Sequence, residues 1–203
     1  MIVIVDNRTG NVGSIRNILK KGGHASKISS DPKDLWEADK IILPGVGAFD
    51  AGMDKLHQLG TLEALNKKVL DERVPVLGIC LGMQLMSMDS EEGRLPGLGW
   101  IKARTIRFKK EELNGKRIPN MGWNSLSVRK SHPLMRDIDG GSSFYFVHSY
   151  HVVCEDQDDV LATTDYGITF TSAFQHGNIM GTQFHPEKSL RWGIKVLSNF
   201  AGM

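Results

Sequence analysis

A cysteine stands between two glycines in the segment GICLGMQ, residues 78–84, directly after an apolar run at 74–77. This pattern predicts a buried strand that ends at Cys80 and turns sharply into a helix. Side chains two residues on either side of such a turn would collide, and Gly78 and Gly82 remove that collision. The first N–H groups of the helix point at the sulfur and favour the nucleophilic thiolate. We therefore predict a nucleophile elbow at Cys80; a small cysteine packed against the sheet is the alternative, and Cys154 is interpreted as core.

A thiolate nucleophile needs a base and a group that orients the base. In QFHPEKS, residues 183–189, the proline holds His185 in an extended conformation, so His185 and Glu187 project to the same side. A carboxylate beside an imidazole fixes its tautomer and stabilises the imidazolium. Spacing alone does not exclude the alternative that His185 and Glu187 form an ion pair at the exposed end of a strand. The other histidines are predicted on the surface (His24, His57, His132, His176) or on opposite faces of one strand, where they make a poor metal pair (His148, His151).

The first half of the chain alternates short apolar stretches with amphipathic ones, which is typical of a parallel sheet covered by helices on both faces. Predicted strands cover residues 2–5, 25–29, 41–43 and 74–79, and predicted helices cover 12–21 and 61–72. From about residue 98 strands predominate, at 99–108, 125–129, 143–154, 160–165, 168–175 and 179–184, with a hairpin at 176–178 and a final helix at 190–200. No linker divides the halves. We predict one α/β domain over residues 1–203, with a mixed, largely parallel sheet.

Composition excludes several classes of protein. Of the residues, 40% are hydrophobic and 24% are charged, and 25 basic against 23 acidic residues give a net charge of +2. That balance lacks the basic footprint of a nucleic-acid-binding protein. No apolar stretch approaches the ~20 residues of a membrane span. With two cysteines there is no disulfide framework, so a reducing, cytoplasmic location is expected.

Four motifs together carry a resemblance to a known family. They are LPGVGAF (43–49), PNMGWN (119–124), YFVHSY (145–150) and QFHPEKS (183–189), in addition to the elbow. In order and spacing the chain resembles the class I, or triad, glutamine amidotransferases, and among them the glutaminase subunits of imidazole glycerol phosphate synthase. The resemblance runs the whole length of the chain.

The resemblance implies that Cys80 attacks the side-chain amide of L-glutamine, with His185 and Glu187 completing a catalytic triad. It implies an oxyanion hole from the backbone of Leu81 and of Val46 and Gly47, and it implies neither metal nor other cofactor. The residues that it assigns to glutamine binding are Gly45, Gln84, Glu92, Tyr145, His148, Ser149 and Tyr150. Without the resemblance, Gln84 is a polar residue on the elbow helix and Glu92 is a loop acid.

The partner implied is a (β/α)8 cyclase subunit that forms a heterodimer with an ammonia channel and uses the ammonia to make imidazole glycerol phosphate. Asn120, Trp123, Asn124 and Lys188 are assigned to that interface, although core packing explains Trp123 equally well. The chain departs from the family at Asn120, where histidine is usual, and in the loop of residues 6–11. These departures leave open a paralogue that supplies ammonia to a sugar amidotransferase of surface-polysaccharide synthesis.

Hypotheses from other classes follow from the same residues. A cysteine peptidase or thiol esterase uses the same triad logic, but it would act on peptides or esters without a partner. A non-catalytic scaffold would have lost the triad, whereas Cys80, His185 and Glu187 are all present.

Overall fold

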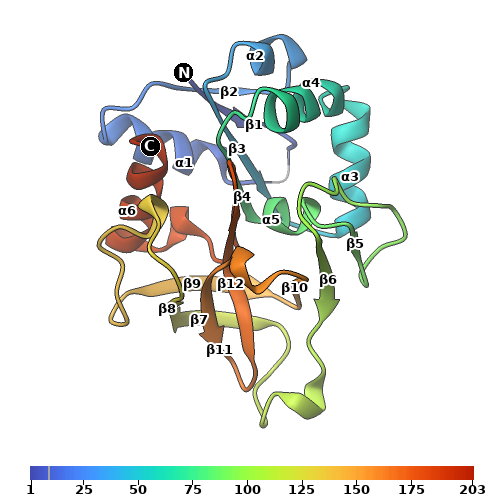
Figure 1. The fold of residues 1–203 in the computed structure, drawn as a ribbon, viewed down its shortest axis with the longest axis vertical. Coiled ribbons are helices and arrows are strands. Elements are labelled where there is room, and N and C mark those ends of the chain that lie inside the picture. Colours follow the sequence, from blue (N-terminus) through green and yellow to red (C-terminus); the bar gives the residue numbers. More distant parts are fainter. Residues whose placement is uncertain (9) are drawn as a thin grey trace.

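The computed structural model describes residues 1–8 and 10–203, so Thr9, in the loop where the sequence departs from the family, lies outside the described residues. Strands and helices alternate in the first half (Figure 1). They are β1 (Ile2–Val5), α1 (Val12–Lys21), β2 (Ser26–Ser29), α2 (Pro32–Trp36), β3 (Lys40–Gly45), α3 (Phe49–Gln58), α4 (Leu62–Asn66), the π-helical turn η1 (Lys67–Asp71), β4 (Val76–Cys80) and α5 (Leu81–Leu85).

The second half is mostly extended, as predicted. It comprises β5 (Asp89–Ser90), β6 (Ala103–Arg107), η2 (Lys110–Glu112), β7 (Asn120–Ser125), β8 (Ser127–Val128), η3 (Pro133–Met135), β9 (Ser143–His148), β10 (Tyr150–Cys154), η4 (Gln157–Asp159), β11 (Val160–Asp165), β12 (Thr169–His176), β13 (Ile179–Thr182), η5 (Pro186–Lys188) and α6 (Leu190–Ala201).

The main sheet is mixed. Its strands follow the order β2-β1-β3-β4-β13-β12-β10-β6-β5, and every pair from β2 to β13 is parallel. The antiparallel part begins at the β12–β13 hairpin, where His176 pairs with Ile179 as the turn at 176–178 predicted. The predicted fold class, a largely parallel α/β sheet with an elbow, is confirmed.

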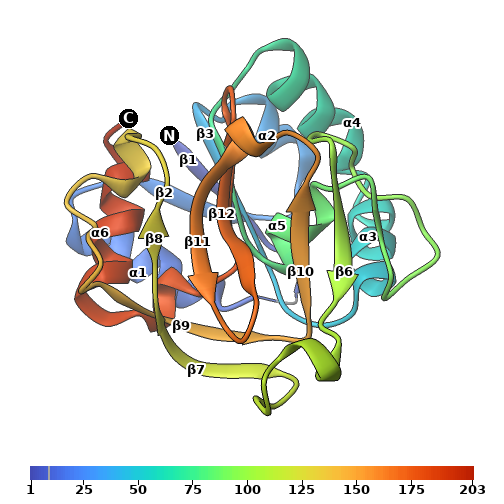
Figure 2. The same ribbon diagram turned by 60° about the horizontal axis from the view of Figure 1, so that its bottom comes forward.

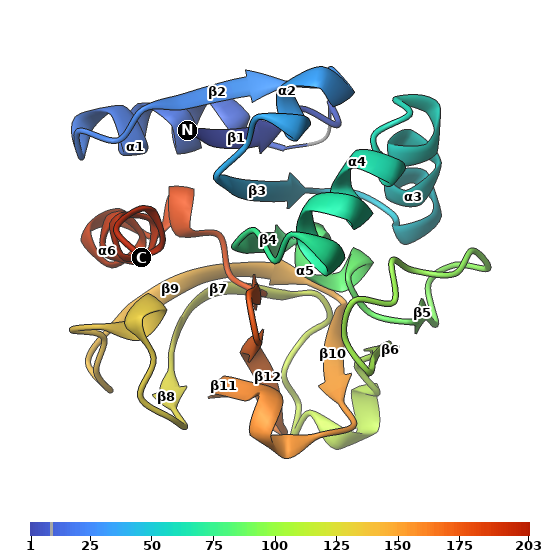
Figure 3. The same cartoon turned by 45° about the horizontal axis from the view of Figure 1, so that its top comes forward.

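Helices cover both faces of the parallel part (Figure 3). Successive side chains of β1 show that both faces are covered. Ile2 and Ile4 pack in a core with α1 and α6, and Val3 and Val5 pack in a second core with α2, α3 and α4. Strands buried on both faces read as continuous apolar runs, which is why β1 and β4 were recognisable from sequence. No helix in the ranges 1–8 and 10–203 combines the length and the apolar character needed to cross a membrane.

A second sheet, formed by β7 and β9 alone, closes one end of the molecule. The two strands are antiparallel, with Asn120 opposite His148 and Trp123 opposite Tyr145. Figure 2 shows them running across the ends of β10, β11 and β12. The predicted single strand over 143–154 is therefore wrong, since the chain turns at Ser149 and β9 and β10 belong to different sheets.

Other differences from the predicted elements are local. Helix α3 was not predicted, and neither was strand β7. The helix predicted over 61–72 changes from α to π geometry at Lys67. The strand predicted over 99–108 is shorter than expected, because β6 begins only at Ala103. Because His148 and His151 lie on different strands, the argument that placed them on opposite faces does not apply; both are buried.

The elbow glycines are required by close backbone packing. A β-carbon on Gly82 would lie 1.7 Å from the carbonyl oxygen of Leu43 in β3, and one on Gly78 would lie 2.7 Å from the backbone nitrogen of Met83. Neither backbone neighbour can move without shifting a central strand or α5. The glycines that bracket Cys80 therefore let α5 lie directly on the sheet.

We predict that Gly82→Ala lowers the free energy of unfolding by about 3 kcal/mol, the upper end for overpacking, because the methyl group overlaps backbone rather than a side chain. Gly13→Ala, in α1, is the matched control: nothing lies within 4 Å of its β-carbon. It should stabilise the chain by about 0.5–1 kcal/mol through helix propensity. Urea denaturation of both variants measures the difference, and a Gly82→Ala midpoint equal to that of the unsubstituted chain would contradict the packing argument.

Candidate active site

Cys80 occupies the turn between β4 and α5 with φ 53° and ψ −108°. Positive φ is uncommon for a residue with a β-carbon, and such strain is found where packing enforces it, often at reactive sites. Cys80 borders a cavity of about 320 Å³, within the range of small-molecule sites. The cavity is lined by Val46, Gly47, Cys80, Leu81, Gln84, Glu92, Pro119, Val147, His148, Ser149, Tyr150 and His185.

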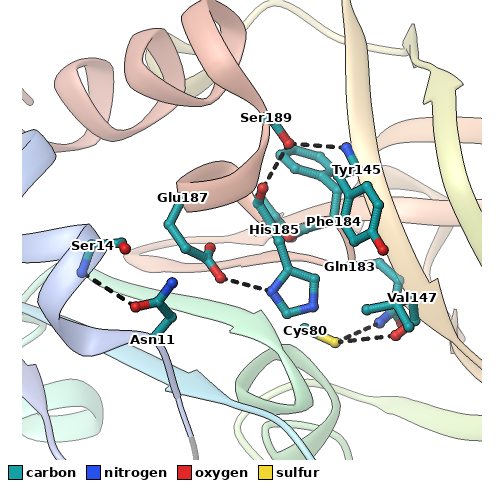
Figure 4. A network of polar contacts seen from close by, with 11 residues as sticks. Asn11, Ser14, Cys80, Tyr145, Val147, Gln183, Phe184, His185, Glu187 and Ser189 are labelled. Carbon is teal, nitrogen blue, oxygen red and sulfur yellow. Dashed lines mark hydrogen bonds and ion pairs between the residues drawn. The ribbon is translucent and has the colours of Figure 1, made fainter.

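His185 reaches Cys80 because β13 is the neighbour of β4. The two strands run parallel with Thr182 opposite Ile79, so both chains leave the sheet at the same edge. Nδ1 of His185 lies 2.9 Å from Oε1 of Glu187, and the two side chains are only 1% and 3% exposed. Figure 4 shows the imidazole between the Glu187 carboxylate and the Cys80 sulfur. The structure thus brings the three predicted triad residues together.

The charge state of His185 follows from its neighbours. Burial opposes protonation, but the interactions with Cys80 and then with Glu187 outweigh it and raise the pKa of His185 to about 9. Its Nε2 has no hydrogen-bond partner in the described part of the chain. At neutral pH the ring is therefore an imidazolium, with the Nε2 proton free to be donated.

Ser189 fixes the loop that carries the base. Its Oγ accepts a hydrogen bond from the backbone nitrogen of Tyr145 at 3.0 Å and donates one to the carbonyl of His185 at 2.6 Å. The backbone nitrogen of His185 donates to the Tyr145 carbonyl at 2.9 Å. Sequence reasoning included Ser189 in a motif but gave it no role. The only feature of the sequence that pointed to this role is the position of Ser189, four residues after the base and at the start of a helix.

Gln183 is a second residue that sequence reasoning missed. It is fully buried, and its Nε2 donates to Sγ of Cys80 over 3.7 Å while its Oε1 accepts from Nε2 of Gln84 at 3.1 Å. The spacing of Gln183 and His185, two apart in an extended segment, places both on the side of the nucleophile and could have identified it.

His148 forms the wall opposite the elbow helix. Its Nδ1 lies 2.8 Å from the carbonyl of Tyr150, and its Nε2 lies 3.1 Å from Nδ2 of Asn120. Burial lowers the pKa of His148 to about 3, so the ring is neutral. Asn124 donates to Oδ1 of Asn120 at 3.0 Å.

The predicted oxyanion donors border the same cavity. Leu81 is the first residue of α5, so its N–H has no acceptor within the helix, and Val46 and Gly47 follow the end of β3. Gly47 has φ +107°, a conformation that favours glycine. Oε2 of Glu92 accepts from the backbone nitrogen of Phe49 at 2.9 Å and so fixes the start of α3 behind this loop.

Three predicted site residues lie elsewhere than expected. Gly45 does not line the cavity, because it packs against Leu81 at the β3–α5 contact. Tyr145 does not line the cavity, and its ring centroid lies 6.0 Å from that of Trp123 and 5.6 Å from Nζ of Lys188. Asn120 was assigned to the partner interface, but it is fully buried against His148.

The remaining interface residues divide between surface and interior. Trp123 is 50% exposed and neighbouring Met121 is 62% exposed, whereas Asn124 is half-buried on the inner side of β7. Asn11, from the departing loop, caps α1, because its Oδ1 accepts a hydrogen bond from the backbone nitrogen of Ser14 at 3.4 Å (Figure 4).

Other candidate chemistry is limited in the described residues. Cys154 is buried, and burial raises the pKa of its thiol to about 12, which fits its interpretation as core. Within residues 1–8 and 10–203, no group of three or more His, Cys, Asp or Glu side chains is placed to hold a metal ion.

Comparison with known proteins gives a consistent picture. The family described as "Glutamine amidotransferase class-I" matches residues 3–202. The chain is 51% identical to imidazole glycerol phosphate synthase subunit HisH 2 of Methanococcus maripaludis and 46% identical to the subunit of the same name from Pseudomonas aeruginosa, each covering 98% of both chains. A solved structure described as a glutamine amidotransferase has a TM-score of 0.71 at 20% identity and covers 100% of both chains, a likeness of fold.

We predict that Glu187→Gln makes the chain less stable in a pH-dependent way. A raised pKa in the folded state stabilises the protein fully below about pH 6.5, and this contribution disappears as the pH rises through about 9. Without the carboxylate, part of that contribution is lost. The difference in free energy of unfolding between the two proteins should therefore be largest near pH 6.5 and shrink toward pH 9.

Asp159→Asn is the matched control, because it removes a carboxylate 2.9 Å from His176, whose side chain is 61% exposed. Water screens that pair, so its pH-dependent difference should be small. A Glu187→Gln difference that stays constant from pH 6 to pH 9.5 would mean that Glu187 does not stabilise the imidazolium.

Proposed function

The chain belongs to the class-I glutamine amidotransferase family, and we propose that it is the glutaminase subunit of an imidazole glycerol phosphate synthase, acting in histidine biosynthesis. It hydrolyses L-glutamine and passes the ammonia to a synthase partner. The observation that carries this proposal is the buried Cys80–His185–Glu187 arrangement on the wall of a cavity large enough for glutamine. The identity to named synthase subunits over nearly the whole chain supports it.

In the first half-reaction the Cys80 thiolate attacks the carboxamide carbon of glutamine and the C=O π bond opens to an oxyanion. The tetrahedral intermediate then collapses, the C–N bond breaks, and the Nε2 proton of His185 goes to the departing nitrogen. Ammonia leaves and a glutamyl thioester remains on Cys80. A His185 pKa of about 9 places the required proton on the imidazole at neutral pH.

In the second half-reaction the now neutral His185 takes a proton from water, which attacks the thioester. Collapse of the second tetrahedral intermediate breaks the C–S bond, releases glutamate and restores the thiolate–imidazolium pair. Glu187 holds the ring through Nδ1 in both steps, so it orients the base and does not itself react.

The cavity walls supply groups that suit glutamine. Gln84 uses its Nε2 for the Tyr150 carbonyl and Gln183, which leaves its Oε1 to accept from the substrate. Glu92 uses Oε2 for the Phe49 N–H and offers its other oxygen to the substrate ammonium group. The backbone of Ser149 and Tyr150 lines the opposite wall.

The oxyanion is stabilised by the Leu81 N–H and by a backbone N–H of Val46 or Gly47. The positive φ of Gly47 means that this peptide can rotate at little cost, and its β-carbon position is open space. A donor that is aligned only when the partner is bound would prevent wasteful hydrolysis of glutamine.

The proposed partner is a (β/α)8 cyclase subunit that receives ammonia through a channel within a heterodimer. Near the cavity, the exposed Met121, Trp123 and Lys188 and the half-buried Tyr145 form an aromatic and cationic surface suited to docking. We further propose a single glutamine amidotransferase domain over residues 1–203, no cofactor, and a cytoplasmic location shared with other biosynthetic enzymes.

A second candidate is a paralogous subunit that supplies ammonia to a sugar amidotransferase of surface-polysaccharide synthesis. One observation favours it: Asn120 stands where the family usually has histidine. A cysteine peptidase or thiol esterase is disfavoured, because the class-I glutamine amidotransferase family matches residues 3–202 and the named relatives are synthase subunits.

We predict that Cys80→Ala abolishes glutamine hydrolysis in the reconstituted complex, leaving less than about 10⁻³ of the rate because the nucleophile is lost. Ammonium salts should still support the synthase reaction, since the acceptor site lies on the partner. The assay measures glutamate release and product formation with the histidine-pathway cyclase and, separately, with a sugar-amidotransferase system. Glutamate release by Cys80→Ala would remove Cys80 from the mechanism, and stimulation by the second system alone would select the paralogue.

We predict that Gly47→Val reduces partner-stimulated turnover about 10²–10³-fold, the effect of one lost oxyanion donor. Valine strains a backbone that needs positive φ. The isolated chain should be a poor glutaminase, and the partner should raise its turnover by orders of magnitude. Gly60→Val, at another positive φ with open space, is the control for strain alone. Full activity of the isolated chain would contradict the proposed switch.

A further inference from the structure

A continuous path of hydrogen bonds joins β7 to the nucleophile. The Tyr150 carbonyl accepts from His148 on one side and from Gln84 on the other, at 2.8 and 3.0 Å. From Gln84 the path continues through Gln183 to Sγ of Cys80. At its other end Asn120 contacts His148 and is itself contacted by Asn124. All the ring and amide groups between Asn120 and Cys80 are at least nine-tenths buried.

The contact with Tyr150 shows which nitrogen of His148 carries the proton. A carbonyl oxygen can only accept, so Nδ1 must be the donor to Tyr150. Because the buried ring is neutral, Nε2 is then an acceptor. It needs a donor, and the amide nitrogen of Asn120 at 3.1 Å supplies it.

The contact with Asn124 is consistent with this orientation of the Asn120 amide. Nδ2 of Asn124 donates to Oδ1 of Asn120, which leaves Nδ2 of Asn120 directed at His148. Each group in the sequence Asn124, Asn120, His148, Tyr150 therefore has one consistent donor or acceptor role. A consistent buried network of this kind holds its members in one arrangement.

We propose that Asn120 is a positioning residue for the glutamine site: it holds His148 as the Nδ1–H tautomer, and His148 thereby fixes the Tyr150 carbonyl and the Ser149–Tyr150 wall of the cavity. The role of this wall in binding glutamine rests on the proposed function, whereas the role of Asn120 toward His148 does not. Asn120 touches neither the cavity nor the triad, so its effect passes through His148.

Loss of the Asn120 donor leaves Nε2 of His148 buried without a partner. The ring can relieve this by turning toward the cavity, which breaks the bond from Nδ1 to Tyr150. The wall then has to be ordered when glutamine binds, so KM should rise about 10-fold, the effect of one unsatisfied buried group. Turnover at saturating glutamine should change by less than about threefold, because the wall contacts substrate and transition state alike.

The experiment compares Asn120→Leu, which keeps the size but removes the donor, with Asn120→His, which restores an N–H donor. Asn178→Leu is the control, because the half-buried Asn178 also donates two side-chain hydrogen bonds, to the carbonyls of Val69 and Val74, and does not line the cavity. Steady-state kinetics use L-glutamine with the chain bound to its cyclase partner. ¹⁵N NMR of the histidine-labelled chain reports which nitrogen of His148 is protonated.

Asn120→Leu should raise KM and broaden or shift the His148 nitrogen signals, and Asn120→His should restore both. Asn178→Leu should lower the melting temperature and leave KM and the His148 signals unchanged. An unchanged His148 tautomer together with a KM within twofold in Asn120→Leu would overturn the inference. If the tautomer changes but no variant, nor the unsubstituted chain, hydrolyses glutamine, the positioning role stands and the proposed function fails.

Discussion

The close approach of the Gly82 backbone to the carbonyl of Leu43, which leaves no room for a β-carbon, determines where the rest of the site lies. Gly78, in β4, packs against the backbone of Gly82 and Met83 in α5. The two glycines of GICLG therefore belong to one interface between α5 and the sheet. Because α5 lies directly on β3, the chain at Cys80 is forced to positive φ. The same contact brings Leu81 beside the end of β3, where Val46 and Gly47 begin. Nucleophile and oxyanion loop are thus positioned by a single close approach.

Two buried histidines on the same cavity have opposite protonation for a simple reason. Burial lowers the pKa of both, but the interactions of His185 with Cys80 and Glu187 raise its pKa to about 9, whereas His148 has no carboxylate or thiolate partner and its pKa falls to about 3. Neutral neighbours cannot compensate for desolvation, and charged ones can. His185 can therefore transfer a proton, whereas the neutral His148 can hold the Ser149–Tyr150 wall of the cavity through hydrogen bonds.

Residue patterns predicted the parts of the structure that depend on local rules. The elbow followed from GICLG, the buried parallel strands from their apolar runs, and the pairing of His185 with Glu187 from a spacing of two beside a proline. What could not be predicted depends on contacts between distant segments. The turn at Ser149 is invisible in the extended pattern of 143–154, since both halves are strands. Asn120 has the polarity of a surface residue, and only the pairing of β7 with β9 buries it against His148.

The position of β13 has a consequence for the order in which the protein is made. This strand is inserted between β4 and β12, although it lies near the end of the chain and β4 lies before the middle. During synthesis, the apolar edge of β4 is left without its second neighbour until almost all of the protein has emerged. An open, flat, apolar edge invites pairing with other chains. The same delay means that a nascent chain holds its nucleophile without its base, and so cannot consume glutamine before it is complete enough to meet a partner.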